Sequence, residues 1–321
     1  MSSHAVEVVR LRELVPHPNA DKLALVSVFG YTVCVNKDEW REGDLAAYVP
    51  PDSIVPNTAE FAFLDGHLRI RAKKLRGVVS FGLLLQAPAG AGVGQDVAER
   101  LGITHYEPTL PITAGDNESG PPGFCDSKYD IENLRRYPGV IQDGTLVHIT
   151  EKIHGANARF TWRNERLWVG SRTGWKKESD SCLWWRVKNS CPQIEEFCRA
   201  NHDCTLYGEV FGQVQNLRYG SPNRIRFAAF DVSWEDGIFM SIYQTHTLLN
   251  DYKVPRVPII HYEVPYSFDL CADAAEGDSR VVGADHVREG CVVKPMIEMY
   301  SASVGRVIFK CVGGGYLLLK G

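Results

Sequence analysis

Short hydrophobic runs with alternating polar positions dominate the first hundred residues. Residues 6–11, 24–30, 31–35 and 45–50 are each typical of a β-strand, and turn-forming glycine, proline, asparagine and aspartate separate them. Several short strands at this spacing favour a small barrel, for which the OB-fold is the simplest topology. We therefore predict an OB-type β-barrel over residues 1–100.

The rest of the chain mixes turn, strand and helix patterns. Residues 101–125 are rich in proline, glycine, aspartate and asparagine, which predicts a linker. Residues 129–137 are a candidate short helix, and residues 179–199 form an apolar face with helical spacing that can break near Pro192. Strand-like runs lie between and after these helices, so we predict a second, α+β domain over residues 126–321.

Composition narrows the class of protein. The net charge of −4 excludes a globally basic nucleic-acid binder, so any such contact must use a local basic patch. The nine cysteines include no C-x-x-C pair, which argues against a structural zinc site. No signal pattern opens the chain, and no apolar run approaches the roughly 20 residues of a membrane span. We expect a reduced, cytoplasmic protein that does not enter a membrane.

One basic segment stands out in this acidic chain. It carries five cations, namely Arg69, Arg71, Lys73, Lys74 and Arg76. The first two alternate with Leu68 and Ile70, which predicts a strand with both arginines on one face. Such a row can bind the phosphates of a nucleic acid or protect the edge of a sheet from pairing. The pattern alone leaves both interpretations open.

A lysine lies at a predicted bend between two strands. Residues 144–150 and 158–162 alternate as strands, and Lys152 and Gly155 lie between them. A lysine amine becomes nucleophilic when burial or neighbouring cations lower its pKa. The glycine allows a ligand or another strand to approach closely. An ordinary surface lysine before a turn has the same sequence pattern. The later segments of the chain are therefore needed to distinguish a nucleophilic lysine from a surface lysine.

The hexapeptide Lys152-Ile153-His154-Gly155-Ala156-Asn157 resembles motif I of the covalent nucleotidyltransferases, which are the ATP-dependent DNA and RNA ligases and the mRNA capping enzymes. DNA ligases and capping enzymes typically carry aspartate where His154 stands. Histidine followed by Gly-x-Asn is similar to the nick-sealing RNA ligases. Segments resembling the later motifs follow in order over residues 145–312 and carry Arg172, Glu209, Phe230, Glu289, Lys294 and Lys310.

The resemblance implies how ATP is bound and activated. Lys152 attacks the α-phosphorus of ATP and forms lysyl-AMP. Glu209 holds the ribose hydroxyls or helps to bind metal, and Phe230 stacks on the adenine, with Phe227 as the neighbouring candidate. Lys294 contacts the nucleotide phosphates.

The resemblance also implies metal and substrate contacts. Glu289, with Glu209, binds Mg²⁺ or Mn²⁺, between which the sequence does not choose. Asn157 and Arg172 hold the 5′-phosphate of the RNA, and Arg172 does so as a bidentate clamp. His154 either acts in the same step or is a neutral histidine bonded to the backbone.

One position departs from the family pattern. Motif V usually has two lysines separated by one residue, of which Lys310 fits the first and contacts phosphate. Val312 occupies the second position, and Arg306 could supply the missing positive charge from the same strand.

Together these features predict an ATP-dependent RNA ligase. Its fold is α+β, an N-terminal OB-type β-barrel followed by an antiparallel-sheet nucleotidyltransferase domain of the ATP-grasp-like ligase type. It would seal 3′-OH and 5′-phosphate ends, as nicks in RNA duplexes, for RNA repair and as a monomer. Two alternatives remain. A capping guanylyltransferase or DNA ligase conflicts with His154 and with the lack of an OB domain after motif V. A non-catalytic OB-type RNA-binding protein conflicts with the intact Lys152, Glu209 and Glu289.

Overall fold

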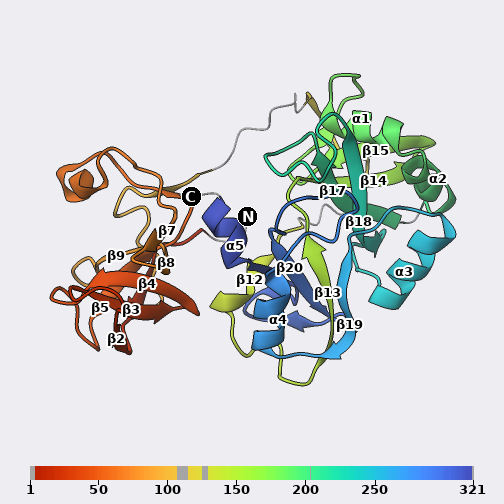
Figure 1. The fold of residues 1–321 in the computed structure, drawn as a ribbon. Helices are drawn as coiled ribbons and strands as arrows, with labels where there is room; N and C mark the ends of the chain where they lie inside the picture. The colour runs from red at the N-terminus through yellow and green to blue at the C-terminus, as the bar shows by residue number, and fades with distance from the viewer. Residues whose placement is uncertain (1–3, 107–114, 125–128, 203, 320–321) are drawn as a thin grey trace. The chain divides into compact units, whose positions relative to one another are not determined.

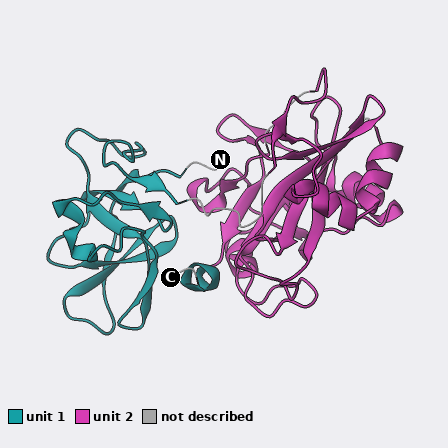
Figure 2. Ribbon diagram, turned by 90° about the horizontal axis from the view of Figure 1, so that it is seen from above, with its two compact units in different colours: residues 1–108, 314–321 teal, residues 109–313 magenta. Residues whose placement is uncertain are grey.

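The computed structural model describes residues 4–106, 115–124, 129–202 and 204–319. The chain forms two compact units, residues 1–108 with 314–321 and residues 109–313 (Figure 2). The C-terminal helix α5 (Gly314–Leu319) belongs to the first unit, where it contacts β7 (Ala72–Leu75). The sequence prediction had extended the second domain to residue 321.

Short antiparallel strands build the first unit (Figure 1). One sheet has the order β1-β5-β9, with bounds Glu7–Arg10, Leu45–Val49 and Leu83–Gln86. Another has the order β2-β3-β4, with bounds Leu14–Pro16, Leu23–Val28 and Tyr31–Asn36. Two smaller pairs are β7 with β8 (Val78–Phe81) and β6 (Ser53–Ile54) with β10 (Thr104–His105). The strands surround two apolar clusters, one of which includes Phe61 from the 3₁₀ helix η1 (Ala59–Leu64).

The basic segment forms a hairpin rather than the predicted strand over residues 68–71. Arg69 makes only an isolated bridge with Ile54, and the regular pairing of β7 with β8 begins at Ala72. Arg76 (φ 46°) and Gly77 (φ 96°) form the two-residue turn, in which both residues need positive φ.

Two sheets build the second unit (Figure 1). The six-stranded sheet has the order β11-β16-β15-β14-β17-β18, with bounds Asn117–Glu118, Trp175–Lys176, Arg166–Ser171, Ala156–Arg163, Cys204–Gly212 and Ile225–Trp234. The five-stranded sheet has the order β12-β23-β20-β13-β19, with bounds Glu132–Asn133, Phe309–Val312, Gly290–Pro295, Leu146–Lys152 and Ile259–Pro265. A small β21–β22 hairpin pairs Tyr300–Ser301 with Gly305–Arg306. Among the described strand pairs of this unit, β12 with β23 is parallel and the rest are antiparallel.

In the described part of this unit, four α-helices cover the two sheets. Helices α1 (Leu183–Ser190), α2 (Gln193–Ala200) and α3 (Ile242–Asp251) bury apolar side chains against the six-stranded sheet. Helix α4 (Phe268–Ala275) packs on the five-stranded sheet. Among the described residues, no helix is long and apolar enough to span a membrane.

The two helical predictions have different outcomes. The apolar segment over residues 179–199 does break before Pro192, because Pro192 lacks the N–H that would continue helix α1. The predicted helix over residues 129–137 is wrong, since Glu132–Asn133 pairs with β23 and only the 3₁₀ turn η2 (Leu134–Arg136) follows. A tertiary strand pairing has overridden the local helical pattern.

Candidate active site

Lys152 is the last residue of β13, and β14 begins four residues later at Ala156. The lysine therefore lies at the bend between two strands, as its sequence context indicated. Gly155 lies in this bend directly beside β17, where a Cβ would collide with the Val210 carbonyl oxygen. Any other residue at this position would push the lysine bend away from β17.

Two carboxylates surround the lysine ammonium. Lys152 Nζ lies 2.9 Å from Glu289 Oε2, in the residue just before β20, and Glu209 on β17 adds a second negative charge. Burial acts to lower the pKa of Lys152, but the attraction of Glu289 and Glu209 outweighs it and raises the pKa.

The two carboxylates are not equivalent. Burial raises the pKa of Glu209 to about 8, against the lowering effect of Lys152, and the Glu289 charge adds to the rise. Burial also acts to raise the pKa of Glu289, but Lys152 and His154 hold it well below its usual range. Glu209 is therefore the carboxylate whose burial is not offset by the positive charge of Lys152.

His154 is fixed on several sides. Its Nδ1 lies 3.3 Å from Glu289 Oε2, and its Nε2 lies 2.8 Å from Asn216 Oδ1. Its backbone N–H donates to the Tyr219 hydroxyl at 2.7 Å. Asn216 and Tyr219 come from the loop between β17 and β18, which sequence analysis did not select.

Asn157 and Arg172 lie on neighbouring strands of the six-stranded sheet. Asn157, on β14, pairs in register with Glu209, and its buried Oδ1 accepts no hydrogen bond from the described residues. Arg172 directly follows β15, and its Nη1 donates to Asp130 at 2.8 Å. A phosphate bound by Arg172 would have to compete with this carboxylate.

Lys294 lies on β20 but is directed at a buried carboxylate. Its Nζ lies 2.9 Å from Asp231 Oδ1 and 3.3 Å from the Phe230 carbonyl oxygen. Arg306 Nη1 and the Tyr129 hydroxyl donate to the other oxygen of Asp231 at 2.8 Å and 2.6 Å. The resemblance had assigned Lys294 to nucleotide phosphates, whereas here it balances Asp231.

Arg306 does not replace the missing second lysine of motif V in this structure. Besides Asp231, its guanidinium binds both oxygens of Glu298, at 2.8 Å and 2.6 Å. Lys310, on β23, lies close enough to Lys152 to feel its charge. Burial, with the Lys152 charge second, lowers the pKa of Lys310 to about 8.

Phe230 is partly exposed on β18 and contacts an aromatic ring from a distant segment. The Tyr129 ring centroid lies 4.8 Å from that of Phe230. Phe227, the alternative candidate, is buried in the core against Phe160. Asp231 directly follows Phe230 in a largely apolar strand, and a carboxylate at such a position is the signal by which the sequence could have identified it.

The basic hairpin divides into two sets of residues. Arg69 Nη2 forms an ion pair with Asp52 at 2.5 Å, and its guanidinium lies 3.6 Å from the Tyr106 ring centroid. The other four basic side chains of the segment are exposed, and these are Arg71, Lys73, Lys74 and Arg76. Asn19 Nδ2 donates to the Arg76 carbonyl oxygen at 3.0 Å, so the preceding loop supports the turn.

The donors around Lys152 suit a hard divalent cation. Among the described residues no cluster of three or more histidine, cysteine or acidic side chains forms a complete metal site. Glu209 and Glu289 supply two carboxylates, which matches a Mg²⁺-type ion that keeps water and binds substrate phosphates. Burial raises the pKa of Glu209, and a cation bound beside the two carboxylates would offset this cost of burial.

A lysine at a strand end, two flanking carboxylates and two antiparallel sheets define a covalent nucleotidyltransferase fold. A family model described as RNA ligase matches residues 145–312, and a model of an OB-fold domain matches residues 5–87. The chain therefore belongs to the RNA ligase family. The predicted OB barrel and nucleotidyltransferase domain are confirmed.

Solved structures of a Naegleria gruberi RNA ligase resemble the whole chain. Its complex with PPi has a TM-score of 0.84 at 25% identity, covering 99% of this chain and 98% of that chain. A lysine-to-alanine mutant with ATP and Mn has a TM-score of 0.83 at 25% identity, covering 98% of both chains. A glutamate-to-alanine mutant with AMP and Mn has a TM-score of 0.84 at 25% identity, covering 99% of both chains. No curated protein sequence matches the chain significantly.

Proposed function

We propose that this RNA ligase uses ATP to join a 3′-OH end to a 5′-phosphate end through a lysyl-AMP intermediate. The observation that carries the proposal is the placement of Lys152 Nζ 2.9 Å from Glu289, at a strand end inside the segment that matches the family. Support comes from the similar Naegleria protein, which was solved with ATP, with AMP and with PPi.

In the first step, Lys152 Nζ forms a bond to the α-phosphorus of ATP. The bond from that phosphorus to the bridging oxygen breaks, and pyrophosphate leaves with the electron pair. Lys152 must first lose the proton that Glu289 and Glu209 stabilise. Mg²⁺ or Mn²⁺ held by Glu289 and Glu209 would neutralise these carboxylates and the phosphate charge. We propose that Lys310, whose pKa responds to the charge of Lys152, adds positive charge beside the leaving group.

Other residues of the site orient the nucleotide. We propose that the Phe230 ring covers one face of the adenine. Glu209, once neutral or bound to metal, can accept from the ribose hydroxyls. Asn157 lies next to Glu209 on the neighbouring strand, and its buried side-chain oxygen has no donor among the described residues.

In the later steps AMP moves to the RNA. An oxygen of the 5′-phosphate attacks the phosphorus of lysyl-AMP, and the N–P bond breaks. The 3′-OH then attacks the activated 5′-phosphate, and AMP leaves as the phosphodiester forms. Arg172, once released from Asp130, and Asn157 would hold the 5′-phosphate, with His154 fixed beside Glu289.

The substrate we propose is a nick in duplex RNA, sealed by a cytoplasmic monomer in RNA repair. The support is the His-Gly-x-Asn form of motif I together with an OB-fold unit that presents Arg71, Lys73, Lys74 and Arg76. These cations would hold the backbone without reading sequence.

The test is transfer of label from α-labelled ATP and, separately, α-labelled GTP, with Mg²⁺ or Mn²⁺, to wild type and to Lys152→Ala. Lys177→Ala, which changes an exposed lysine outside the site, is the matched control. Label from ATP on the wild type and the control, and none on Lys152→Ala, is the expected result. Label from GTP would move the assignment to capping. No label on a folded wild type would leave a non-catalytic RNA-binding protein.

A second assay addresses the RNA substrate. The labelled enzyme is mixed with a nicked RNA duplex and with the same strands unpaired. We expect sealing of the nick and release of AMP. Equal sealing of unpaired strands would contradict the preference for a nicked duplex.

A further inference from the structure

A groove lined by three arginines opens in the second unit, formed by residues that the reaction above does not use. Its volume is about 760 Å³, within the roughly 300–1,000 Å³ typical of ligand pockets. The lining comes from α1 and α2, from the start of β18 and from nearby loops, and consists of Arg186, Ser190, Cys191, Gln193, Ser221, Arg224, Ile225, Arg226, Phe227, Pro255 and Val282. This lining contains no carboxylate.

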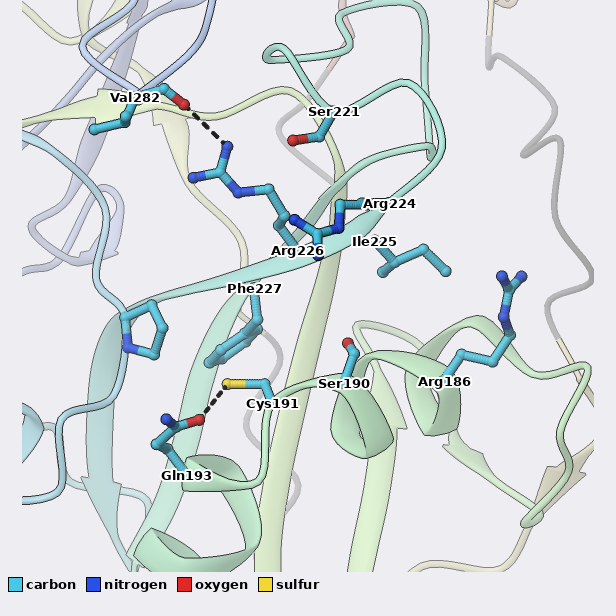
Figure 3. A pocket seen from close by; sticks show the side chains of 11 residues that line it. Arg186, Ser190, Cys191, Gln193, Ser221, Arg224, Ile225, Arg226, Phe227 and Val282 are labelled. Carbon is cyan, nitrogen blue, oxygen red and sulfur yellow. Dashed lines mark hydrogen bonds between the residues drawn. The ribbon is translucent and has the colours of Figure 1, made fainter.

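The charges face the groove from two sides. Figure 3 shows Arg224 and Arg226 at the start of β18 and Arg186 rising from α1 across from them. Neither Arg186 nor Arg224 forms an ion pair with an acidic side chain of the described residues. Burial lowers the pKa of Arg226, and the charge of Arg224 lowers it further. Like charges crowded without a counter-ion favour the binding of an anion.

The remaining lining suits a ribonucleotide chain. Ser190 Oγ donates to the Val187 carbonyl oxygen, so its lone pairs remain available to accept from a 2′-OH. Ser221 provides a second hydroxyl. The exposed Val282 side chain and the ring of Pro255 give apolar surfaces against which a base or a sugar can pack.

The groove is also linked to the lysine bend. Arg226 Nη1 donates to the backbone oxygens of Tyr219 and Val282 at 3.3 Å and 3.2 Å. The hydroxyl of the same Tyr219 accepts the backbone N–H of His154. The loop that forms one wall of the groove therefore also holds motif I.

We propose that this groove binds the phosphodiester backbone of an RNA strand of the substrate, with Arg186 and Arg224 as the phosphate contacts. This inference rests on the proposed function, because it gives the ligase a second RNA contact in addition to the OB-fold unit. Arg226 is a positioning residue, since its guanidinium is bonded to the loop.

The experiment compares three forms of the full chain by fluorescence anisotropy with a labelled nicked RNA duplex over a range of salt concentrations. The first is wild type, the second Arg186→Ala/Arg224→Ala, and the third Arg12→Ala/Lys37→Ala, which removes two exposed charges elsewhere. We expect the groove variant to bind the RNA duplex about ten-fold or more weakly than wild type. The slope of log affinity against log salt concentration should become less steep by about 1–2, because two phosphate contacts are lost. The control should bind as wild type.

Two further measurements keep the outcomes distinct. Label transfer from ATP to Lys152 needs no RNA, so the groove variant should retain it, which also shows that it is folded. Arg186→Lys/Arg224→Lys should restore most of the affinity. Unchanged RNA affinity and salt slope in an adenylated groove variant would overturn the groove proposal alone. Absence of label transfer from ATP to the wild type would overturn the proposed function instead.

A small phosphate could be the true ligand, and a competition arm decides this. Inorganic tripolyphosphate is titrated against wild type and the groove variant without RNA. If it binds only to wild type while RNA affinity is the same in both, the groove is a site for small anions and the proposal is overturned.

Discussion

Asp231 and Lys294 form a buried ion pair, with 2.9 Å between Oδ1 and Nζ. Arg306 and the Tyr129 hydroxyl bind the second oxygen of the same carboxylate. A buried charge is stable only when partners replace its hydration. Asp231 therefore joins strand β18 of one sheet to strand β20 of the other.

The first prediction concerns removal of this carboxylate. Asp231→Ala leaves Lys294 without its anionic partner and Arg306 with Glu298 alone, and it should lower the free energy of unfolding by about 3–5 kcal/mol. Urea unfolding of wild type and variant measures the loss. Asp251→Ala, at the exposed end of α3, is the control and should change stability by less than about 0.5 kcal/mol. Equal losses of unfolding free energy in the two variants would show that the contacts of Asp231 add nothing to stability.

The same residue predicts an acid-dependent loss of stability. Burial acts to raise the pKa of Asp231, but Arg306 and Lys294 outweigh it and lower the pKa from 3.8 to about 2. The stabilisation is then complete above about pH 4 and is lost as the pH falls toward 2. The difference between wild type and Asp231→Asn should stay constant from pH 7 to 5 and shrink below pH 4. A difference that persists unchanged to pH 2 would contradict the ion-pair explanation.

Local motif spacing in the sequence identified residues such as Lys152. It could not identify the ion-pair and hydrogen-bond partners of Asp231. Lys152 lies at its strand end, and the strands predicted at residues 24–30 and 31–35 correspond to β3 and β4, because alternation and turn residues are local signals. The partners of Asp231 lie 63, 75 and 102 residues away in the chain. No local pattern encodes such pairing. For the same reason Arg69 looked available to RNA, although Asp52 binds it.

The buried His148 and the half-buried His246 predict a second pH effect in a different range. Burial, with nearby positive charge, lowers the pKa of His148 to about 3 and that of His246 to about 4. Below about pH 6.5 the unfolded chain takes up protons that the folded chain does not, so stability falls as the pH decreases toward 4. Each histidine contributes up to about 1.4 kcal/mol per pH unit.

The measurement is the free energy of unfolding between pH 7 and 4. His148→Gln removes one of these groups and should make the dependence on pH less steep. His67→Gln, at an exposed position, is the control and should keep the slope of wild type. An unchanged slope in His148→Gln would show that this ring takes up its proton in the folded protein.

The fourth prediction separates the two sets of residues in the basic hairpin. Lys73→Ala/Lys74→Ala removes exposed charges and should weaken binding to a nicked RNA duplex several-fold, with a salt slope lower by about 1–2 and unchanged stability. Arg69→Ala should instead lower the free energy of unfolding by about 1 kcal/mol, because the Asp52 ion pair and the Tyr106 ring contact are lost. Weaker RNA binding by Arg69→Ala with unchanged stability would reverse this assignment.

The fifth prediction distinguishes two lysines to which the family resemblance gives one role. Lys310 lies near Lys152, and its lowered pKa of about 8 shows that the folded protein disfavours its charge. Lys310→Met should therefore keep or raise stability while lowering label transfer from ATP at least ten-fold, because positive charge beside the pyrophosphate is lost. Lys294→Met should lower stability, since Asp231 keeps only Arg306 and Tyr129.

A double-mutant cycle tests the Lys294 part of this prediction. In Asp231→Asn/Lys294→Met both charges are absent, so the two changes should cost less together than the sum of each alone, by about 0.5–3 kcal/mol. Label transfer by Lys294→Met, assayed at a temperature where the variant is folded, should exceed that of Lys310→Met. If Lys294→Met is as stable as wild type yet transfers no label, its ammonium leaves Asp231 for the phosphates when ATP binds, and the ion pair seen here is a resting arrangement of a catalytic lysine.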